Sequence, residues 1–362
     1  MTRTAAPAPT IAAVERRPGR APSPIAWLLA PAPAARLAVL RIVVGAYATA
    51  WAAIRLPAHL GHADQVAGRW HPVGVLAPLG APPADVAIVL LAAAAPVLGL
   101  LFVAGWRYGA VGPLFAVAML VLATLDSAWG QVFHTENLVV LHLLVLAAGP
   151  AADVLAVGRP RPRLADAAGA HDRANATGAD GPAHHEALDD PGKPTGRDGR
   201  YGWPVRLAAV AVVLAYVLAG IAKLRIGGLD WLDGDTLRHL VANDNLRKAL
   251  LGDSYSPIGT NLVGQAWLFP PLAVVTVVVE LGAVLALAGG RWRTAWVAAA
   301  WLFHVGVLAL MAIVFPYQLA GVAFAPFFRL ERLADRYTGR ATGRTRARRP
   351  CWGPVSRACG AG

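Results

Sequence analysis

Long apolar runs alternate with short polar segments over most of this 362-residue chain. The runs are about 20 residues long, the length at which an α-helix crosses roughly 30 Å of hydrocarbon. They predict seven membrane-spanning helices and a shorter eighth, at 35–56, 84–104, 109–129, 135–157, 203–224, 265–289, 294–315 and 317–330. The pattern therefore indicates an all-α fold, a polytopic transmembrane helix bundle of about seven or eight helices with no soluble domain.

The composition supports a membrane protein. Of all residues, 56% are hydrophobic and 15% are charged, whereas soluble domains carry about 25% charged residues. The roughly ten-residue segments of alternating hydrophobicity that are typical of transmembrane β-barrels do not occur. The two cysteines, Cys351 and Cys359, form no CxxC pair, so we expect neither a metal site nor a redox dithiol.

The formal net charge of +12 indicates membrane topology rather than nucleic-acid binding. Basic residues gather in segments that the alternation of helices places on one side, which is typical of cytoplasmic loops. We therefore predict a plasma-membrane protein with both termini in the cytoplasm. The chain is predicted to begin with a disordered N-terminus (1–34), followed by helices one to four (35–158) and a disordered cytoplasmic linker (159–202). Helices five to eight follow (203–330), with an outer loop at 225–264, and the chain ends in a basic tail (331–362).

Ionisable residues inside predicted spans are costly, so each is a candidate for function. Glu280 and His304 lie at similar distances before and after the turn at 290–293, so antiparallel neighbouring helices hold them at one depth. Two interpretations of this intramembrane pair remain open, a structural lock and a proton-handling site. We expect Arg41 to snorkel to the surface, and His142 to be a hydrogen-bonded core residue.

Lys223 is one of three lysines in a chain with 33 lysines and arginines. A lysine in a dry site can lose its proton, whereas an arginine effectively cannot. Tyr216, Gly220 and Lys223 are spaced i, i+4 and i+7, and therefore share one helix face. Lys223 is either a titratable amine at the membrane boundary or a basic residue that suits the last turn of its helix and snorkels.

The predicted turn between helices three and four lies on the same outer side as Lys223. It carries several side chains that handle protons, among them Asp126, His134 and Glu136. Helix capping by Thr135 or Asn137 is the alternative interpretation of its polar residues.

A family resemblance adds to this interpretation. The string Ala219-Gly-Ile-Ala-Lys223-Leu, followed by Asp230-Trp231-Leu-Asp-Gly, is similar to the signature of the vitamin K-dependent gamma-carboxylase superfamily. Bacterial members of that superfamily carry the horizontally transferred transmembrane domain. The turn that begins at His134 resembles the His/Asn-bearing turn of the family, and the two helices after residue 265 resemble its later spans.

The resemblance implies that Lys223 is the catalytic base toward a reduced quinone of the vitamin K or menaquinol type. It implies His134 as a second catalytic residue, and O2 and CO2 as further reactants. The residues that it places around the quinone are Tyr216, Gly220, Asp230, Trp231, Glu136 and Asn137. The expected partners are membrane lipid, the lipid-soluble quinone and an unidentified second substrate. Because the chain ends soon after its last predicted helix, we expect no lumenal peptide-recognition domain.

Two hypotheses about function follow. The first is a quinol-dependent, carboxylase- or epoxidase-like membrane enzyme with Lys223 as its base. The second is a non-enzymatic membrane carrier, or a partner of a redox complex, in which Glu280 and His304 form a proton site.

Overall fold

A computed structural model describes residues 23–133, 135–158 and 197–334. Within these ranges nearly all regular structure is helical, which confirms the predicted all-α class. The elements are α1 (Pro24–Leu28), β1 (Ala32–Pro33), α2 (Ala34–Ile54), α3 (Leu56–Leu60), η1 (Gly61–Asp64), η2 (Ala67–Arg69), η3 (Gly74–Leu76), α4 (Asp85–Ala104), α5 (Tyr108–Asp126), α6 (Asn137–Ala148), β2 (Arg197–Asp198), α8 (Gly199–Gly227), η4 (Gly228–Asp233), α9 (Asp235–Leu250), α10 (Pro257–Leu262), η5 (Ala266–Leu268), α11 (Phe269–Leu281), η6 (Gly282–Ala288), α12 (Gly290–Met311), α13 (Pro316–Leu319) and η7 (Val322–Phe327). His134 and most of the segments predicted to be disordered lie outside the described residues.

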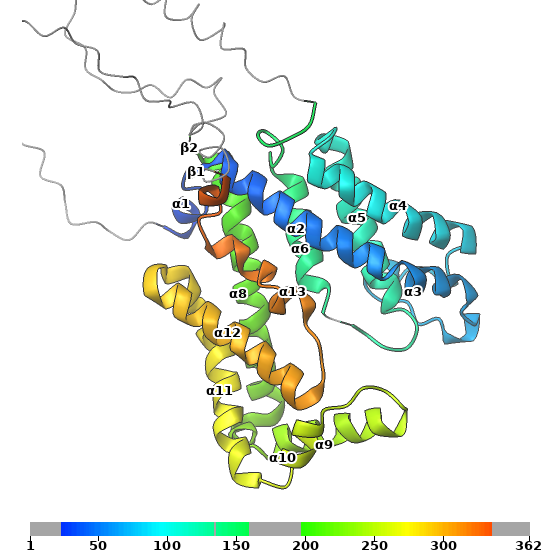
Figure 1. The fold of residues 1–362 in the computed structure, drawn as a ribbon, viewed down its shortest axis with the longest axis vertical. Helices are drawn as coiled ribbons and strands as arrows, with labels where there is room; N and C mark the ends of the chain where they lie inside the picture. Colours follow the sequence, from blue (N-terminus) through cyan, green and yellow to red (C-terminus); the bar gives the residue numbers. More distant parts are fainter. Residues whose placement is uncertain (1–22, 134, 159–196, 335–362) are drawn as a thin grey trace, which may run out of the picture.

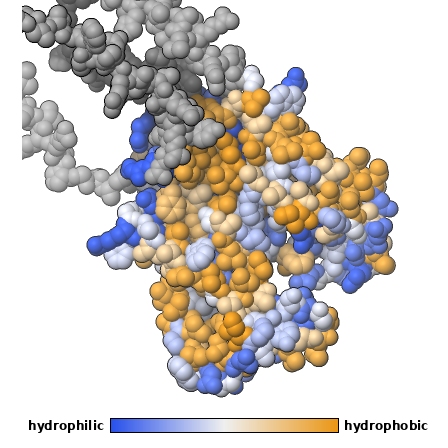
Figure 2. All heavy atoms as spheres, in the orientation of Figure 1, coloured by the Kyte–Doolittle hydropathy of each residue, from blue (hydrophilic) through white to orange (hydrophobic). Residues whose placement is uncertain are grey.

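Six segments of the described chain are long and apolar enough to cross a membrane. They are Ala34–Ile54, Asp85–Ala104, Tyr108–Asp126, Gly199–Asp233, Ala266–Ala288 and Gly290–Met311. Their sides carry exposed apolar residues, such as Leu218, Val278 and Leu302, each more than 60% exposed. Figure 2 shows hydrophobic residues over much of the visible face of the bundle. A surface of this kind faces lipid, so the chain is a multi-pass membrane protein.

The fourth and eighth predicted helices are shorter than their apolar runs. The run at 135–157 is helical only through α6, because Gly149 and Pro150 follow its last turn. The run at 317–330 forms α13 and η7, separated by Gly321 at φ 74°. Apolar character determines what is buried, but proline and left-handed glycine interrupt the backbone hydrogen bonding of a helix.

The predicted outer loop at 225–264 is largely helical, since it holds η4, α9 and α10. These elements cover the last turn of α12, whose final carbonyl groups lack partners within the helix. Asn245 donates to the Leu310 carbonyl at 2.8 Å, and Lys248 donates to the Met311 carbonyl at 2.5 Å. Ser256 caps the neighbouring Ala309 carbonyl. Polar side chains from the loop thus close the end of a membrane-spanning helix.

In the first half of the chain, α2 packs along α4, with α5 and α6 beside them (Figure 1). Arg41 of α2 is fully buried rather than snorkelling to the surface. Its guanidinium donates to the carbonyl oxygens of Ala151, Val103 and Leu155 at 3.0, 3.2 and 2.5 Å. The chain that follows α6 folds back to supply two of these acceptors, which is why the expectation of snorkelling was wrong.

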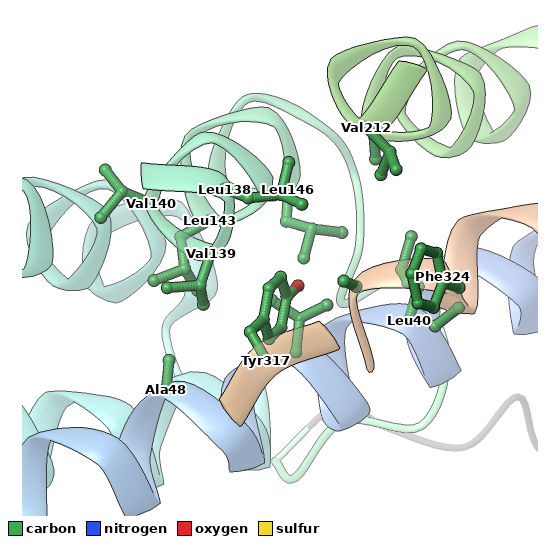
Figure 3. Close-up of a cluster of buried hydrophobic side chains, with 14 of the residues drawn as sticks. Leu40, Ala48, Leu138, Val139, Val140, Leu143, Leu146, Val212, Tyr317 and Phe324 are labelled. Atoms are coloured by element: carbon green, nitrogen blue, oxygen red, sulfur yellow. The ribbon is translucent and has the colours of Figure 1, made fainter. Parts of the chain in front are cut away.

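The two halves meet where α8 packs against α6 and α2. His142 of α6 is buried there, with Nδ1 2.6 Å from the Tyr317 hydroxyl and Nε2 3.1 Å from the Ala208 carbonyl. The expectation of a hydrogen-bonded core histidine is therefore confirmed. Figure 3 shows Tyr317 among apolar side chains of α2 and α6, including Leu40 and Leu143.

Candidate functional site

Lys223 lies near the end of α8 and is paired with Glu280 of α11. Its Nζ donates to Oε1 of Glu280 and forms an ion pair with it. The Lys223 side chain is 22% exposed, while the Glu280 side chain is only 4% exposed. The Lys223 ammonium also lies 5.5 Å from the ring centroid of Trp231, which is buried. The two parts of the Ala-Gly-x-x-Lys-Leu and Asp-Trp motif therefore meet at the amine.

Gly220 allows this pairing by bringing α8 and α11 close together. A Cβ at Gly220 would lie 2.9 Å from Leu281 Cδ2 and 3.1 Å from Glu280 Cβ. A larger side chain would therefore push α11 away from α8. Gly220 serves the packing of the site and contributes no functional group.

His304 of α12 bonds Tyr216 of α8. The Tyr216 hydroxyl lies 2.7 Å from His304 Nε2, and the two rings meet edge to face. Among the described residues no hydrogen bond joins Glu280 to His304 directly, in contrast to the expected pair. The physical reason is that one face of α8 presents both Tyr216 and Lys223, about two helical turns apart. Tyr216 is the partner of His304, and Lys223 is the partner of Glu280.

One cavity of about 550 Å³, which we call the lysine cavity, is lined by the side chains of Lys223, Glu280, Tyr216 and His304. Its polar lining is completed by Asn137 and Gln318. The remaining lining is apolar or aromatic: Leu138, Leu141, Ala215, Leu218, Ala219, Phe303, Val307, Ile313 and Phe315. Leu141 and Leu218 are 45% and 61% exposed on the outer surface of the bundle. The lysine cavity therefore borders the face that lipid covers.

Three buried polar atoms of this lining have no hydrogen-bond partner in the described protein. They are Oε2 of Glu280, Nδ1 of His304 and Oε1 of Gln318. Buried polar groups are normally satisfied, so three such atoms around one cavity call for a ligand or bound water. Gln318 had no signal in the sequence, because it lies in α13, a helix of only four residues, which is too short for a periodicity to relate it to the other residues.

The remaining predicted site residues lie in different places. Asn137 begins α6 and lines the lysine cavity. Glu136 instead lines a neighbouring outer cavity of about 620 Å³, and it accepts a hydrogen bond from Thr135. Asp230 is exposed, and its carboxylate takes part in none of the ion pairs between described residues. The position of His134 is outside the described chain.

The outer cavity has more charged side chains in its lining than the lysine cavity, whose charged residues are Lys223 and Glu280. Its lining includes the side chains of Arg55, Glu136, Asp244, Arg247, Lys248 and Asp253. Both cavities are lined by Ile313, so they adjoin at the connection between α12 and α13. Within the described ranges, no group of three or more His, Cys, Asp or Glu side chains is arranged to hold a metal ion.

The fold and the site define a multi-pass membrane protein with a mainly apolar cavity among its helices, in which a few polar side chains gather. No family model matches the chain, and neither the curated proteins nor the solved structures include a match to it.

Proposed function

We propose that this protein is a membrane enzyme that binds a quinol in the lysine cavity and takes a proton from it. The observation that carries the proposal is the set of three unpartnered polar atoms in a cavity bordered by lipid-facing residues. The resemblance of the motif around Lys223 to the vitamin K-dependent gamma-carboxylase superfamily supports the same assignment.

The lysine cavity suits a quinol in size and chemistry. Ligand sites in proteins measure about 300–1,000 Å³ and are mainly apolar with a few placed polar groups; this one measures about 550 Å³. Phe303 and Phe315 offer aromatic walls for a ring, and His304 Nδ1 is free to bond a ring oxygen. An isoprenoid tail would leave past Leu141 and Leu218 into the bilayer.

A bound quinol supplies an acidic hydroxyl and reducing electrons. The contact between Lys223 and Glu280 changes how the quinol proton is accepted, because an amine that is bonded to a carboxylate is not free to accept it. We assign the base to the pair: the free Oε2 of Glu280 accepts the proton, and the Lys223 ammonium then faces the quinol anion. The net charge of the site stays the same, which matters where charge is poorly solvated.

The test uses the full-length chain in lipid nanodiscs with menaquinol as the probe, and it follows menaquinol binding and oxidation in the presence of O2. Glu280→Gln is expected to slow oxidation by about a hundredfold or more, the scale of general-base catalysis. Arg225→Gln is the control, because Arg225 is exposed on α8, two residues after Lys223, and does not line the lysine cavity. Lys223→Arg shows whether Glu280 or the Lys223 amine accepts the quinol proton. Retained activity assigns the proton to Glu280, and lost activity assigns it to the amine. If menaquinol does not bind saturably, or if the Glu280 and Arg225 variants behave alike, the proposal is wrong.

A carrier is the second candidate function. It is favoured by the presence of Glu280 and His304, from neighbouring helices, in one cavity. Proton-driven uptake of a solute into liposomes that is lost in Glu280→Gln would select the carrier. Menaquinol consumption without such uptake would select the enzyme. In either case we propose a plasma-membrane location with both termini in the cytoplasm, and a polar second substrate that enters through the outer cavity.

A further inference from the structure

A second polar site lies at the opposite end of the bundle, where β1, β2 and α1 gather at the start of α2 and α8 (Figure 1). It is a cavity of about 310 Å³, which we call the arginine cavity. Its charged lining consists of Arg36, Arg197, Arg206, Arg293, Arg329 and Glu331. The charge pattern of the sequence predicts that this end faces the cytoplasm.

The arginine cavity holds more positive charge than its own residues balance. Five guanidinium groups face one carboxylate, an excess of four positive charges. Glu331 is committed to Arg36, which donates to both of its oxygens at 2.7 and 2.5 Å. Arg206 donates to the Ala30 carbonyl, and Arg197 donates to the Pro31 carbonyl at 3.3 Å. Carbonyl groups satisfy hydrogen-bond donors, but they do not cancel the charge.

Two arginines retain donors for a ligand. Nε of Arg293 is buried and has no hydrogen-bond partner in the described protein. The guanidinium carbon of Arg293 lies 5.9 Å from the ring centroid of Phe328, which is the neighbour of Arg329. Arg329 is exposed at the rim of the cavity. An unsatisfied buried guanidinium N–H is costly, and an anion in the cavity would relieve that cost.

We infer that the arginine cavity binds a phosphate group, carried either by the headgroup of an anionic lipid or by a soluble phosphate ester. The planar fork of a guanidinium matches two phosphate oxygens at once, which a lysine ammonium does not. Basic pockets between membrane-spanning helices are sites for anionic lipid headgroups. Apolar residues such as Val205 and Phe327 also line the cavity, and they would contact the glycerol or acyl part of a lipid. The inference is independent of the chemistry proposed for the lysine cavity.

The experiment measures binding to the full-length chain purified in a neutral detergent. One arm titrates phosphatidylglycerol in mixed micelles, a second titrates inorganic phosphate and glycerol phosphate, and phosphatidylcholine is the uncharged reference. Binding is read by native mass spectrometry and by the rise in melting temperature. Saturation by phosphatidylglycerol alone identifies the lipid headgroup as the source, and saturation by the soluble phosphates identifies a solute.

Arg293→Gln is expected to weaken binding about tenfold, the effect of losing one charge-assisted hydrogen bond. Arg291→Gln is the matched control, because it removes the same charge from the same turn but does not line the cavity. Arg329→Gln, at an exposed position, repeats the test if Arg293→Gln fails to fold. Loss of affinity in the Arg293 or Arg329 variant, with the Arg291 variant unchanged, supports the site. Equal losses in all variants, or no preference for phosphate-bearing probes over phosphatidylcholine, would overturn it.

Discussion

The ion pair between Lys223 and Glu280 predicts an unequal response to losing either partner. Lys223→Met leaves a carboxyl group whose side chain is 4% exposed, whereas Glu280→Gln leaves an amine whose side chain is 22% exposed. An isolated carboxylate at such a buried position is expected to fold only in its protonated form. The lysine can instead direct its ammonium toward water along its flexible stem.

The cost of each change follows from that difference. Holding a glutamate protonated at pH 7, when its ordinary pKa is about 4.3, costs about 3.7 kcal/mol, so Lys223→Met should lose about 3–4 kcal/mol of stability. Glu280→Gln should lose about 1 kcal/mol, as expected for a partner that stays solvated. Folding of the Lys223→Met variant takes up a proton, so its deficit should shrink by about 1.4 kcal/mol for each pH unit below 7 until the pH approaches the unfolded pKa. The double variant should lie close to wild type, because neither charge remains.

The assay is reversible unfolding in mixed micelles with increasing sodium dodecyl sulfate, followed by circular dichroism at pH 7 and pH 5. Arg225→Met is the control for Lys223→Met, since Arg225 lies on α8 with Lys223 and is exposed. The reasoning would be refuted if the two single variants lost equal stability at pH 7. A deficit of Lys223→Met that did not change between pH 7 and pH 5 would refute it as well.

Three further predictions concern other parts of the bundle. Gly220→Val should lower stability by about 1–3 kcal/mol, because a Cβ at this position alone would lie only 2.9 Å from Leu281 Cδ2, and valine adds two methyl groups. A melting temperature equal to wild type would contradict the close packing of α8 on α11. Arg41→Met should cost about 3 kcal/mol by leaving backbone carbonyls without donors, as measured by the same detergent unfolding. Burial alone would raise the pKa of Glu331, but the hydrogen bonds and charge of Arg36 hold that pKa below its ordinary value. The stability that this pair contributes should therefore be present above the ordinary glutamate pKa of about 4.3, and it should be lost as the pH falls through the pKa of the folded state. Wild type and Glu331→Gln should differ in stability by about 1 kcal/mol near pH 7, and the difference should disappear under acid conditions.

The sequence was informative about the spans because their length and composition reflect one physical constraint. A helix in hydrocarbon must satisfy its backbone internally and present apolar side chains to lipid, so the runs are visible without a structure. The shared face of Tyr216 and Lys223 was also predictable, since it depends only on the helical repeat. Gly149, Pro150 and Gly321 mark the places where the prediction of continuous helices at 135–157 and 317–330 was wrong.

The pairings across helices were not predictable in the same way. The depth of Glu280 and His304 follows from counting along an antiparallel pair, but their hydrogen-bond partners depend on how a third helix rotates against both. In the structure α8 supplies those partners, and Gly220 sets how closely it approaches. Gln318 joins the site from α13, a four-residue helix that is too short to show a period in the sequence.

The sequence by itself therefore determined a multi-pass, all-α membrane protein and indicated Lys223 as a residue of interest. Only the tertiary structure decided that Lys223 is bound to Glu280, that His304 is bound to Tyr216, and that all four line one cavity. Spans follow from local hydrophobicity, which each segment carries alone. A site follows from contacts between residues far apart in the chain, and those depend on the packing angle and separation of whole helices.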